Sequence, residues 1–201
     1  MSKIDFRVFS ETDRLNTVVV HTPGPEMDLV SPHDREALLF EDILYLSHAR
    51  KEHELMCSVF EKVVGKQGAV LQITDLLRET SELEEARLDF VDQFILASPG
   101  ANLQVFRDDL SHLSADDLFH FVLTGESSLS IEAKPLPNLM FMRDLAAVVG
   151  NHIVLSHAAT SARARESIII NVVVSHHPAF AKFKDHVIKL PKGVTFEGGD
   201  L

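Results

Sequence analysis

The chain has 201 residues, of which 45% are hydrophobic and 24% are charged, and its formal charge at pH 7 is -11. This composition is typical of a globular protein that buries an apolar core, as one large domain or two small ones. The acidic balance argues against a nucleic-acid partner, because proteins that bind phosphate backbones concentrate positive charge.

The amino terminus and the cysteine content favour a cytoplasmic protein. The opening residues, MSKIDFRVFSETDR, lack the apolar segment of a signal peptide. No later stretch approaches the roughly 18 uninterrupted apolar residues that a membrane-spanning helix needs. Cys57 is the only cysteine, so the chain cannot form an internal disulfide framework. We therefore expect a cytoplasmic location, no membrane partner and no redox chemistry.

The first predicted elements are a strand and a helix. Residues 15–21 (LNTVVVH) are rich in β-branched side chains and are followed by Pro-Gly-Pro, which predicts a short buried strand. Residues 31–34 (SPHD) combine a capping hydroxyl, a proline at the first helical position and an acid in the first turn. This combination predicts that a helix begins there.

The next predicted helix is amphipathic and leads into a second strand. Apolar residues recur at three- and four-residue spacing, at Leu46, Ala49, Met56, Cys57, Phe60, Val63 and Val64. Gly65 and Gly68 supply the end of the helix. Residues 69–73 are predicted to form a strand that pairs with the first one. A strand, a helix and a strand in this order indicate an α/β protein.

The middle of the chain is predicted to be a small helical insert. Residues 81–97 form one acidic helical segment, and Ser114, with Asp117 three residues later, caps a second one. We therefore divide the chain into an α/β part at 1–74, a helical insert at 75–130 and a second α/β part at 131–201.

The α/β pattern returns in the last part of the chain. Residues 145–149 and 152–155 flank Gly150-Asn151 and predict a hairpin. A helix is expected at about 161–174, although its isoleucine and valine content is high for a helix. Residues 187–190 then predict one more strand.

The first motif that could carry chemistry is PNLMFMRD, at residues 137–144. A proline-rigidified turn delivers an amide (Asn138), an aromatic ring (Phe141), an arginine and a carboxylate (Asp144) into a loop that enters a strand. The alternative interpretation is a turn whose Asn and Asp satisfy local backbone groups and whose Phe belongs to the core.

The second motif is FEGGD, at residues 196–200. Its two glycines allow the backbone to pass close to another group, with Glu197 and Asp200 on either side of them. Without other information, Gly-Gly between acids is more often a simple turn.

Together these motifs resemble the arginine deiminases, within the superfamily of guanidino-group modifying deiminases and amidinotransferases. Further stretches also look like that family, in its order along the chain. They are LNTVVVHTPGPEM, LLFEDILYLSHARKEHELM, SARARES and SHHPAF. The resemblance covers nearly the whole chain and corresponds to the amino-terminal half of the enzyme. It implies an α/β fold that is part of a pseudo-fivefold propeller of ββαβ modules, with a small helical domain inserted.

The resemblance also implies roles for individual residues. Asp144 and Glu197 would bind the guanidinium of L-arginine. This agrees with the chemistry of the group, because a guanidinium is a planar cation whose five donors are best accepted by carboxylates. Asn138, Phe141 and Gly198 would shape the pocket. Arg163 would meet the substrate α-carboxylate, with Arg165 as the alternative for that role. Asp200 is expected to be structural.

The residues that perform the chemical step in this family are not identifiable in the chain. The family uses a cysteine thiolate near its carboxyl terminus and a histidine that activates water. We expect Cys57 to be an inert core residue, because it lies on the apolar face of its helix, and His176 and His177 to be structural. The cysteine and histidine spacing fits no zinc site, and the resemblance implies no metal or organic cofactor.

The sequence departs from the family pattern in places and leaves alternatives open. The turn after the first strand has the sequence HTPG at residues 21–24, where the family usually has an arginine before Pro-Gly. Residues 142–145 are MRDL, with Met142 and Leu145 at the positions where the family commonly has the Thr and Pro of TRDP.

The leading hypothesis is a fragment of an arginine deiminase that is inactive alone. The alternatives are a short non-catalytic protein that binds arginine or partners a complete deiminase, and a related guanidino hydrolase. The last would lack the helical insert. A homo-oligomer remains open.

Overall fold

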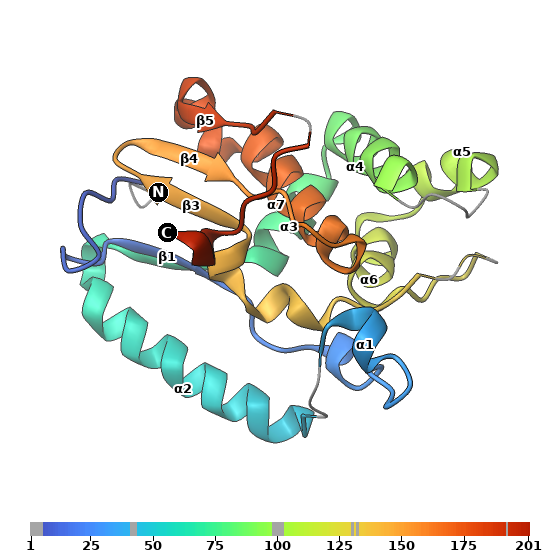
Figure 1. Cartoon of the computed structure of the whole chain (residues 1–201), viewed down its shortest axis with the longest axis horizontal. Coiled ribbons are helices and arrows are strands. Elements are labelled where there is room, and N and C mark those ends of the chain that lie inside the picture. Colours follow the sequence, from blue (N-terminus) through green and yellow to red (C-terminus); the bar gives the residue numbers. More distant parts are fainter. Residues whose placement is uncertain (1–5, 41–43, 98–102, 130, 132, 192) are drawn as a thin grey trace.

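A computed structural model of the chain describes residues 6–40, 44–97, 103–129, 131, 133–191 and 193–201, and its fold is mixed α/β (Figure 1). The strands are β1 (Thr17–Val20), β2 (Ala69–Gln72), β3 (Ala146–Val149), β4 (His152–Leu155) and β5 (Val187–Ile188). The α-helices are α1 (Arg35–Leu38), α2 (Leu46–Val64), α3 (Ile73–Ser81), α4 (Glu84–Ala97), α5 (Arg107–Ser111), α6 (Ala115–Thr124) and α7 (Ala164–His176). The short 3-10 helices are η1 (Pro25–Met27), η2 (Gly65–Gln67), η3 (Leu103–Phe106), η4 (Pro137–Met140), η5 (Met142–Asp144), η6 (Ser161–Arg163), η7 (Pro178–His186) and η8 (Gly198–Asp200).

The first sheet confirms the predicted strand, helix and strand. Strands β1 and β2 pair in parallel, with Thr17 opposite Ala69 and Val20 opposite Gln72. Helix α2 is part of the connection between them and packs against both (Figure 1). It stops at Gly65, which has a φ of 65°, a conformation that residues with a Cβ rarely adopt.

The second sheet has the strand order β3-β4-β5 and contains the predicted hairpin. Strands β3 and β4 are antiparallel, and Gly150, at the turn between them, has a φ of 59°. Strand β5 pairs in parallel with β4 and is shorter than predicted, since it comprises Val187 and Ile188 alone. The connection from β4 to β5 contains α7, so the predicted helix near residue 161 is also confirmed.

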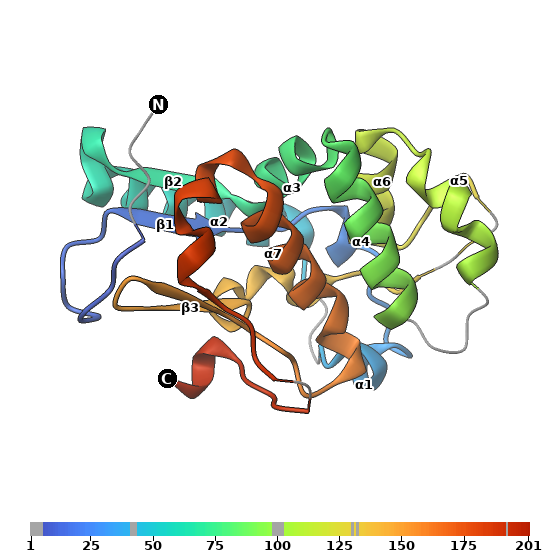
Figure 2. The same cartoon turned by 90° about the horizontal axis from the view of Figure 1, so that it is seen from above.

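Helix α7 lies at the centre of the molecule. It runs between the second sheet and the helices α3 and α4, in both Figure 1 and Figure 2. Ile169 and Val173 are completely buried, and most of the other branched residues of α7 are also inaccessible. Burial on several sides explains why a segment rich in Ile and Val is a helix here, because tertiary contacts override a weak local preference.

One hydrophobic core joins the helical region to the sheets. Its buried residues come from α3, α4 and α6 as well as from β4 and α7, for example Phe94, Phe121, Ile153 and Ile169. Helix α6 begins as predicted, because the Ser114 side chain accepts a hydrogen bond from the backbone N–H of Asp117. The division of the chain at residues 75 and 130 stays a prediction.

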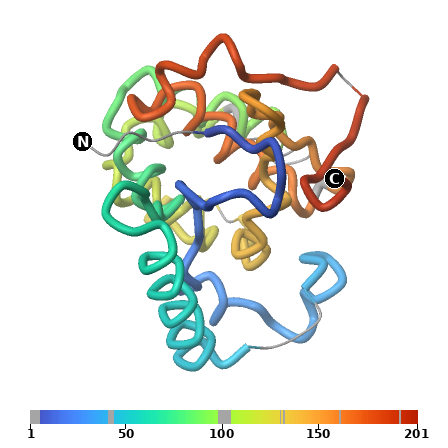
Figure 3. Tube along the Cα trace, turned by 90° about the vertical axis from the view of Figure 1, so that its left-hand side faces the viewer, coloured from blue at the N-terminus to red at the C-terminus, as the bar shows by residue number. Residues whose placement is uncertain are grey.

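Two predictions about the first third of the chain are wrong in detail. The helix predicted from SPHD begins only at Arg35 and has four residues. Its N-cap residue is Asp34, whose side chain accepts a hydrogen bond from the Ser31 hydroxyl and does not cap the backbone. On α2, the predicted apolar face is only partly buried. Cys57 and Val64 face inward, whereas Met56 and Val63 are exposed, because α2 lies at the edge of the molecule (Figure 3).

None of the helices in the described part of the chain has both the length and the apolar character that crossing a membrane requires.

Candidate functional site

The PNLMFMRD stretch forms two successive 3-10 helices, η4 and η5, that lead into β3. Pro137 occupies the first turn of η4, where its fixed φ suits a helix start. The completely buried Leu139 anchors the stretch in the core. Asp144 is the last residue of η5, and its side chain remains a quarter exposed. Local turn chemistry thus places one carboxylate at the beginning of the second sheet.

Glu197 reaches the same place from the end of the chain. The backbone groups of Phe196 and His157 exchange two hydrogen bonds of 3.0 Å, which fixes the segment before Glu197 beside the end of β4. After it, Glu197 and Asp200 form a capping box on η8, in which the Asp200 side chain accepts from the backbone N–H of Glu197. The expected structural role of Asp200 agrees with this contact. Gly198 lies against the backbone of Arg143 and so brings Glu197 next to η5.

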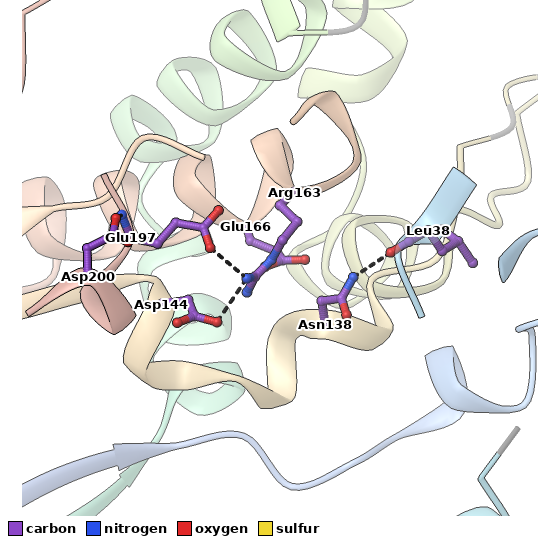
Figure 4. A network of polar contacts seen from close by, with 7 residues as sticks. All are labelled: Leu38, Asn138, Asp144, Arg163, Glu166, Glu197 and Asp200. Atoms are coloured by element: carbon purple, nitrogen blue, oxygen red, sulfur yellow. Dashed lines mark hydrogen bonds and ion pairs between the residues drawn. The ribbon is translucent and has the colours of Figure 1, made fainter. Parts of the chain in front are cut away.

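Arg163 joins the two carboxylates. Its Nη1 donates to Asp144 Oδ2 at 2.9 Å and to Glu197 Oε2 at 3.2 Å (Figure 4). Arg163 is the last residue of η6 and lies directly before the first turn of α7. Only 12% of its side chain is exposed. The structure therefore brings together three residues that lie far apart in the sequence.

A third carboxylate, Glu166, holds the other edge of the same guanidinium. Arg163 Nε donates to Glu166 Oε2 at 2.9 Å, and Nη2 lies 2.9 Å from the same oxygen. Glu166 follows Arg163 by three residues on the first turn of α7, a spacing that places both side chains on one face. Glu166 was not among the predicted site residues, although the R-x-R-E segment and this spacing could have indicated it.

Burial and charge act on the pKa values of this cluster in opposite directions. Burial raises the pKa of the Glu166 carboxyl to about 7, although Arg163 favours its ionised form. Burial also disfavours the charged form of Arg163, but Glu166 and Asp144 outweigh that effect and raise the pKa of Arg163. The Oε1 atom of Glu166 is buried and has no hydrogen-bond partner within the described residues. Burial of this carboxylate without a partner for Oε1 is therefore the physical reason why the pKa of Glu166 is raised.

Arg165 does not reach the carboxylates of Asp144 and Glu197. Its Nη2 donates to the backbone oxygen of Lys134, and its guanidinium lies 6.0 Å from the centre of the Phe94 ring. Burial lowers the pKa of Arg165 to about 10. Arg165 thus has a partly buried position between the helical region and the loop before η4. The role of either arginine toward a substrate carboxylate stays a prediction.

Two other predicted pocket residues, Asn138 and Phe141, belong to the same stretch as Asp144. Asn138 is buried, and its Nδ2 donates to the backbone oxygen of Leu38 at 2.6 Å, as Figure 4 shows. Phe141 is 47% exposed, so its ring is not a core residue. Their expected contacts with a substrate stay predictions.

The residues that the sequence analysis set aside have structural partners. Cys57 is buried on α2, its Sγ lies 3.4 Å from His53 Nδ1, and burial raises the pKa of its thiol. His176 pairs with Asp89 at 2.8 Å and His177 pairs with Glu79 at 2.9 Å. These contacts agree with a structural role for the two histidines, which stays a prediction. Among the described residues, no group of three or more His, Cys, Asp or Glu side chains could hold a metal ion.

Comparison with known proteins identifies relatives of the chain. The family model described as arginine deiminase matches residues 36–124 and 104–201. The chain is 32% identical to an arginine deiminase of Metamycoplasma hominis, over 96% of the chain and 50% of that protein. It is 32% identical to an arginine deiminase of Borrelia recurrentis (strain A1), over 96% of the chain and 52% of that protein. The chain thus spans about half the length of the curated relatives it matches. With its family model matched over most of its length, the chain belongs to the arginine deiminase family.

Proposed function

We propose that this chain provides the guanidinium-binding half of an arginine deiminase, which converts L-arginine and water to L-citrulline and ammonia. One observation carries the proposal. A guanidinium, that of Arg163, lies between Asp144 and Glu197 and bonds to both. The two carboxylates are therefore spaced to accept this chemical group, and the Arg163 side chain occupies the position in which the substrate guanidinium would bind.

The chemistry of the two residue types supports this assignment. A guanidinium is planar and permanently cationic, and a pair of carboxylates can accept several of its five donors. A hydrogen bond to a charged partner contributes on the order of 1.5–3 kcal/mol. The carboxylates of Asp144 and Glu197 are only partly exposed, so water competes less for them than it would at an open surface.

The proposed reaction needs two groups beyond this half of the site. A cysteine thiolate would attack the central carbon of the guanidinium, and ammonia would leave with the electrons of the broken C–N bond. Water activated by a histidine would then cleave the carbon–sulfur bond, which releases citrulline and regenerates the thiol. Cys57 does not suit the first step, because it is buried and its pKa is raised. The proposal therefore assigns binding to this chain and the covalent step to residues outside it.

The proposal extends to the fold and the location. We propose that the two sheets and their helices belong to a pseudo-fivefold propeller of ββαβ modules, with residues 75–130 as a helical insert, and that the protein acts in the cytoplasm. Helices α3, α4, α5 and α6 support the arginine deiminase assignment over an agmatine or dimethylarginine hydrolase, for which no helical insert is expected. A propeller assignment predicts that a structure of a complete protein continues the arrangement of α/β modules around the site.

One observation favours a second candidate function. The binding carboxylates are present, whereas the only cysteine in the sequence, Cys57, is on α2 and hydrogen-bonded to His53. A protein that binds arginine without converting it, or that partners a complete deiminase, would have this composition. Binding and turnover therefore have to be measured separately.

The test is to titrate L-arginine into the 201-residue chain by calorimetry, with Asp144→Asn and Glu197→Gln as variants. We expect the chain to bind L-arginine and each variant to bind at least about tenfold more weakly, which corresponds to about 1.4 kcal/mol. Asp185→Asn is the matched control, since it removes an exposed carboxylate on η7 and should leave binding unchanged. Equal binding by all four proteins, or none by the unmodified chain, would contradict the proposed function.

A further inference from the structure

We propose that Arg163 is an internal competitor for the guanidinium site, and that this competition makes the site selective for ligands that carry both a guanidinium and a carboxylate. The inference rests on the proposed function, because it takes Asp144 and Glu197 as the groups that bind the substrate guanidinium. It goes further because it assigns Arg163 a position between these carboxylates that blocks the substrate until the Arg163 side chain moves away.

Arg163 and a ligand guanidinium need the same two carboxylate oxygens. A single nitrogen of Arg163, Nη1, donates to Oδ2 of Asp144 and Oε2 of Glu197 (Figure 4). A ligand guanidinium bonded to these two oxygens would occupy the position of Nη1. Two cations in van der Waals contact repel each other, most strongly where water is partly excluded. Binding of a ligand guanidinium therefore requires the Nη1 edge of Arg163 to leave.

The Arg163 side chain can leave the site without unfolding α7. Its backbone N–H is bonded to the oxygen of Thr160, and α7 begins one residue later. Movement of the guanidinium needs only rotations of a long side chain. Glu166 bonds to the opposite, Nε edge and is itself buried. We assign Glu166 as a positioning residue that keeps Arg163 beside the site in both positions.

Displacement of Arg163 changes which charges in the cluster are paired. In the structure, one guanidinium lies among the carboxylates of Asp144, Glu197 and Glu166. A ligand with a guanidinium alone supplies a new cation to the first two, but it leaves Arg163 with Glu166 as its only partner in the cluster. A ligand that also carries a carboxylate supplies Arg163 with a second anion. L-Arginine has both groups, whereas agmatine and methylguanidine have a guanidinium and lack a carboxylate; the second charged group of agmatine is an ammonium.

The expected selectivity follows from the competing position. If Arg163 occupies the site most of the time, the apparent affinity of a bare guanidine equals its intrinsic affinity multiplied by the fraction of molecules in which the site is free. Removing Arg163 should therefore strengthen the binding of agmatine and methylguanidine. The same change should weaken the binding of L-arginine relative to them, because its carboxylate loses a partner. If Arg163 only contacted the substrate carboxylate, its removal would leave the affinity for agmatine unchanged.

The experiment is to titrate L-arginine, agmatine and methylguanidine into the 201-residue chain and into Arg163→Met. We expect the unmodified chain to prefer L-arginine to agmatine by about thirtyfold or more, and the variant to prefer it by less than about threefold. Agmatine and methylguanidine should each bind the variant about tenfold more tightly. The matched control is Arg78→Met, which removes an exposed arginine on α3 and should change none of the three affinities.

Unchanged or weaker agmatine binding by Arg163→Met would overturn the inference, even if L-arginine binds the unmodified chain. If no ligand binds either protein, the proposed function fails and the inference fails with it. Thermal unfolding followed by circular dichroism shows whether Arg163→Met folds. If it does not fold, Arg163→Lys provides the test, because a single ammonium cannot keep the contacts of both guanidinium edges. Agmatine should bind that variant more tightly than the unmodified chain, and equal or weaker binding would again overturn the inference.

Discussion

Asp144 and Glu197 share one hydrogen-bond donor. Oδ2 of Asp144 and Oε2 of Glu197 lie 2.9 and 3.2 Å from the same nitrogen of Arg163, although one residue precedes β3 and the other follows β5. Two carboxylates this close to a common donor repel each other unless a cation lies between them. Their convergence on one guanidinium supports the proposal that they bind the guanidinium of a substrate.

The first prediction concerns the charge of Asp144. In a complete arginine deiminase that contains this half, Asp144→Asn should leave folding nearly intact and should lower turnover by several orders of magnitude. The amide keeps the shape of the carboxylate, but it removes the charge and places donors opposite the donors of the substrate. Citrulline release under saturating L-arginine measures the effect. A rate near that of the unmodified enzyme would show that Asp144 is only a turn residue.

The second prediction is that the 201-residue chain releases no citrulline from L-arginine. Catalysis would need a thiolate at the guanidinium carbon, and the only thiol in the sequence is that of Cys57, which is buried and whose pKa is raised by burial. A colorimetric assay for citrulline on the purified chain, with Cys57→Ser in parallel, tests this. Activity that disappears in Cys57→Ser would require a different mechanism.

The third prediction concerns the pH dependence of stability through Glu166. Burial raises the pKa of Glu166 to about 7 in the folded chain, above its ordinary value of 4.5. Between these values the folded state binds more protons than the unfolded state, so the free energy of unfolding should fall as the pH rises from about 4.5 to about 7. Glu166→Gln should lack this part of the slope.

Urea unfolding at a series of pH values from 4.5 to 8 measures that difference between the unmodified chain and Glu166→Gln. Glu85→Gln, which changes an exposed acid on α4, is the control and should retain the slope of the unmodified chain. Parallel stability curves for the unmodified chain and Glu166→Gln would mean that Glu166 does not titrate in this range.

The fourth prediction concerns the close approach that brings Glu197 to Asp144. A Cβ at Gly198 would lie 1.9 Å from the backbone oxygen of Arg143, so Gly198→Ala must push two backbone segments apart. We expect a loss of about 1–3 kcal/mol in the free energy of unfolding, together with weaker L-arginine binding. Urea unfolding and calorimetry measure the two effects.

Gly193→Ala separates steric from conformational effects. A Cβ at Gly193 would meet no described atom within 4 Å, but its φ of 87° is unfavourable for alanine. That variant should lose some stability and keep its affinity for L-arginine. If Gly198→Ala retains both the stability and the affinity of the unmodified chain, the close approach does not position Glu197.

The sequence by itself determined the elements that depend on neighbours along the chain. The β-branched run before Pro-Gly-Pro predicted β1, and apolar spacing with a terminal glycine predicted α2. The hydroxyl of Ser114 predicted the start of α6. Each of these signals depends on residues that lie close together in the sequence, so the element can be predicted without knowledge of the fold. The resemblance to arginine deiminases, which follows from the order of motifs, also needed no structure.

Only the tertiary structure decided how those elements meet. The exposure of Met56 and Val63 on α2 depends on which neighbours cover the helix, and periodicity cannot reveal that. Which of the two arginines contacts Asp144 depends on the direction in which each side chain leaves the start of α7, and local sequence cannot reveal it. Ion pairs between segments far apart in sequence are set by the global arrangement of the backbone, because a carboxylate stabilises whichever cation the fold brings within a few ångströms.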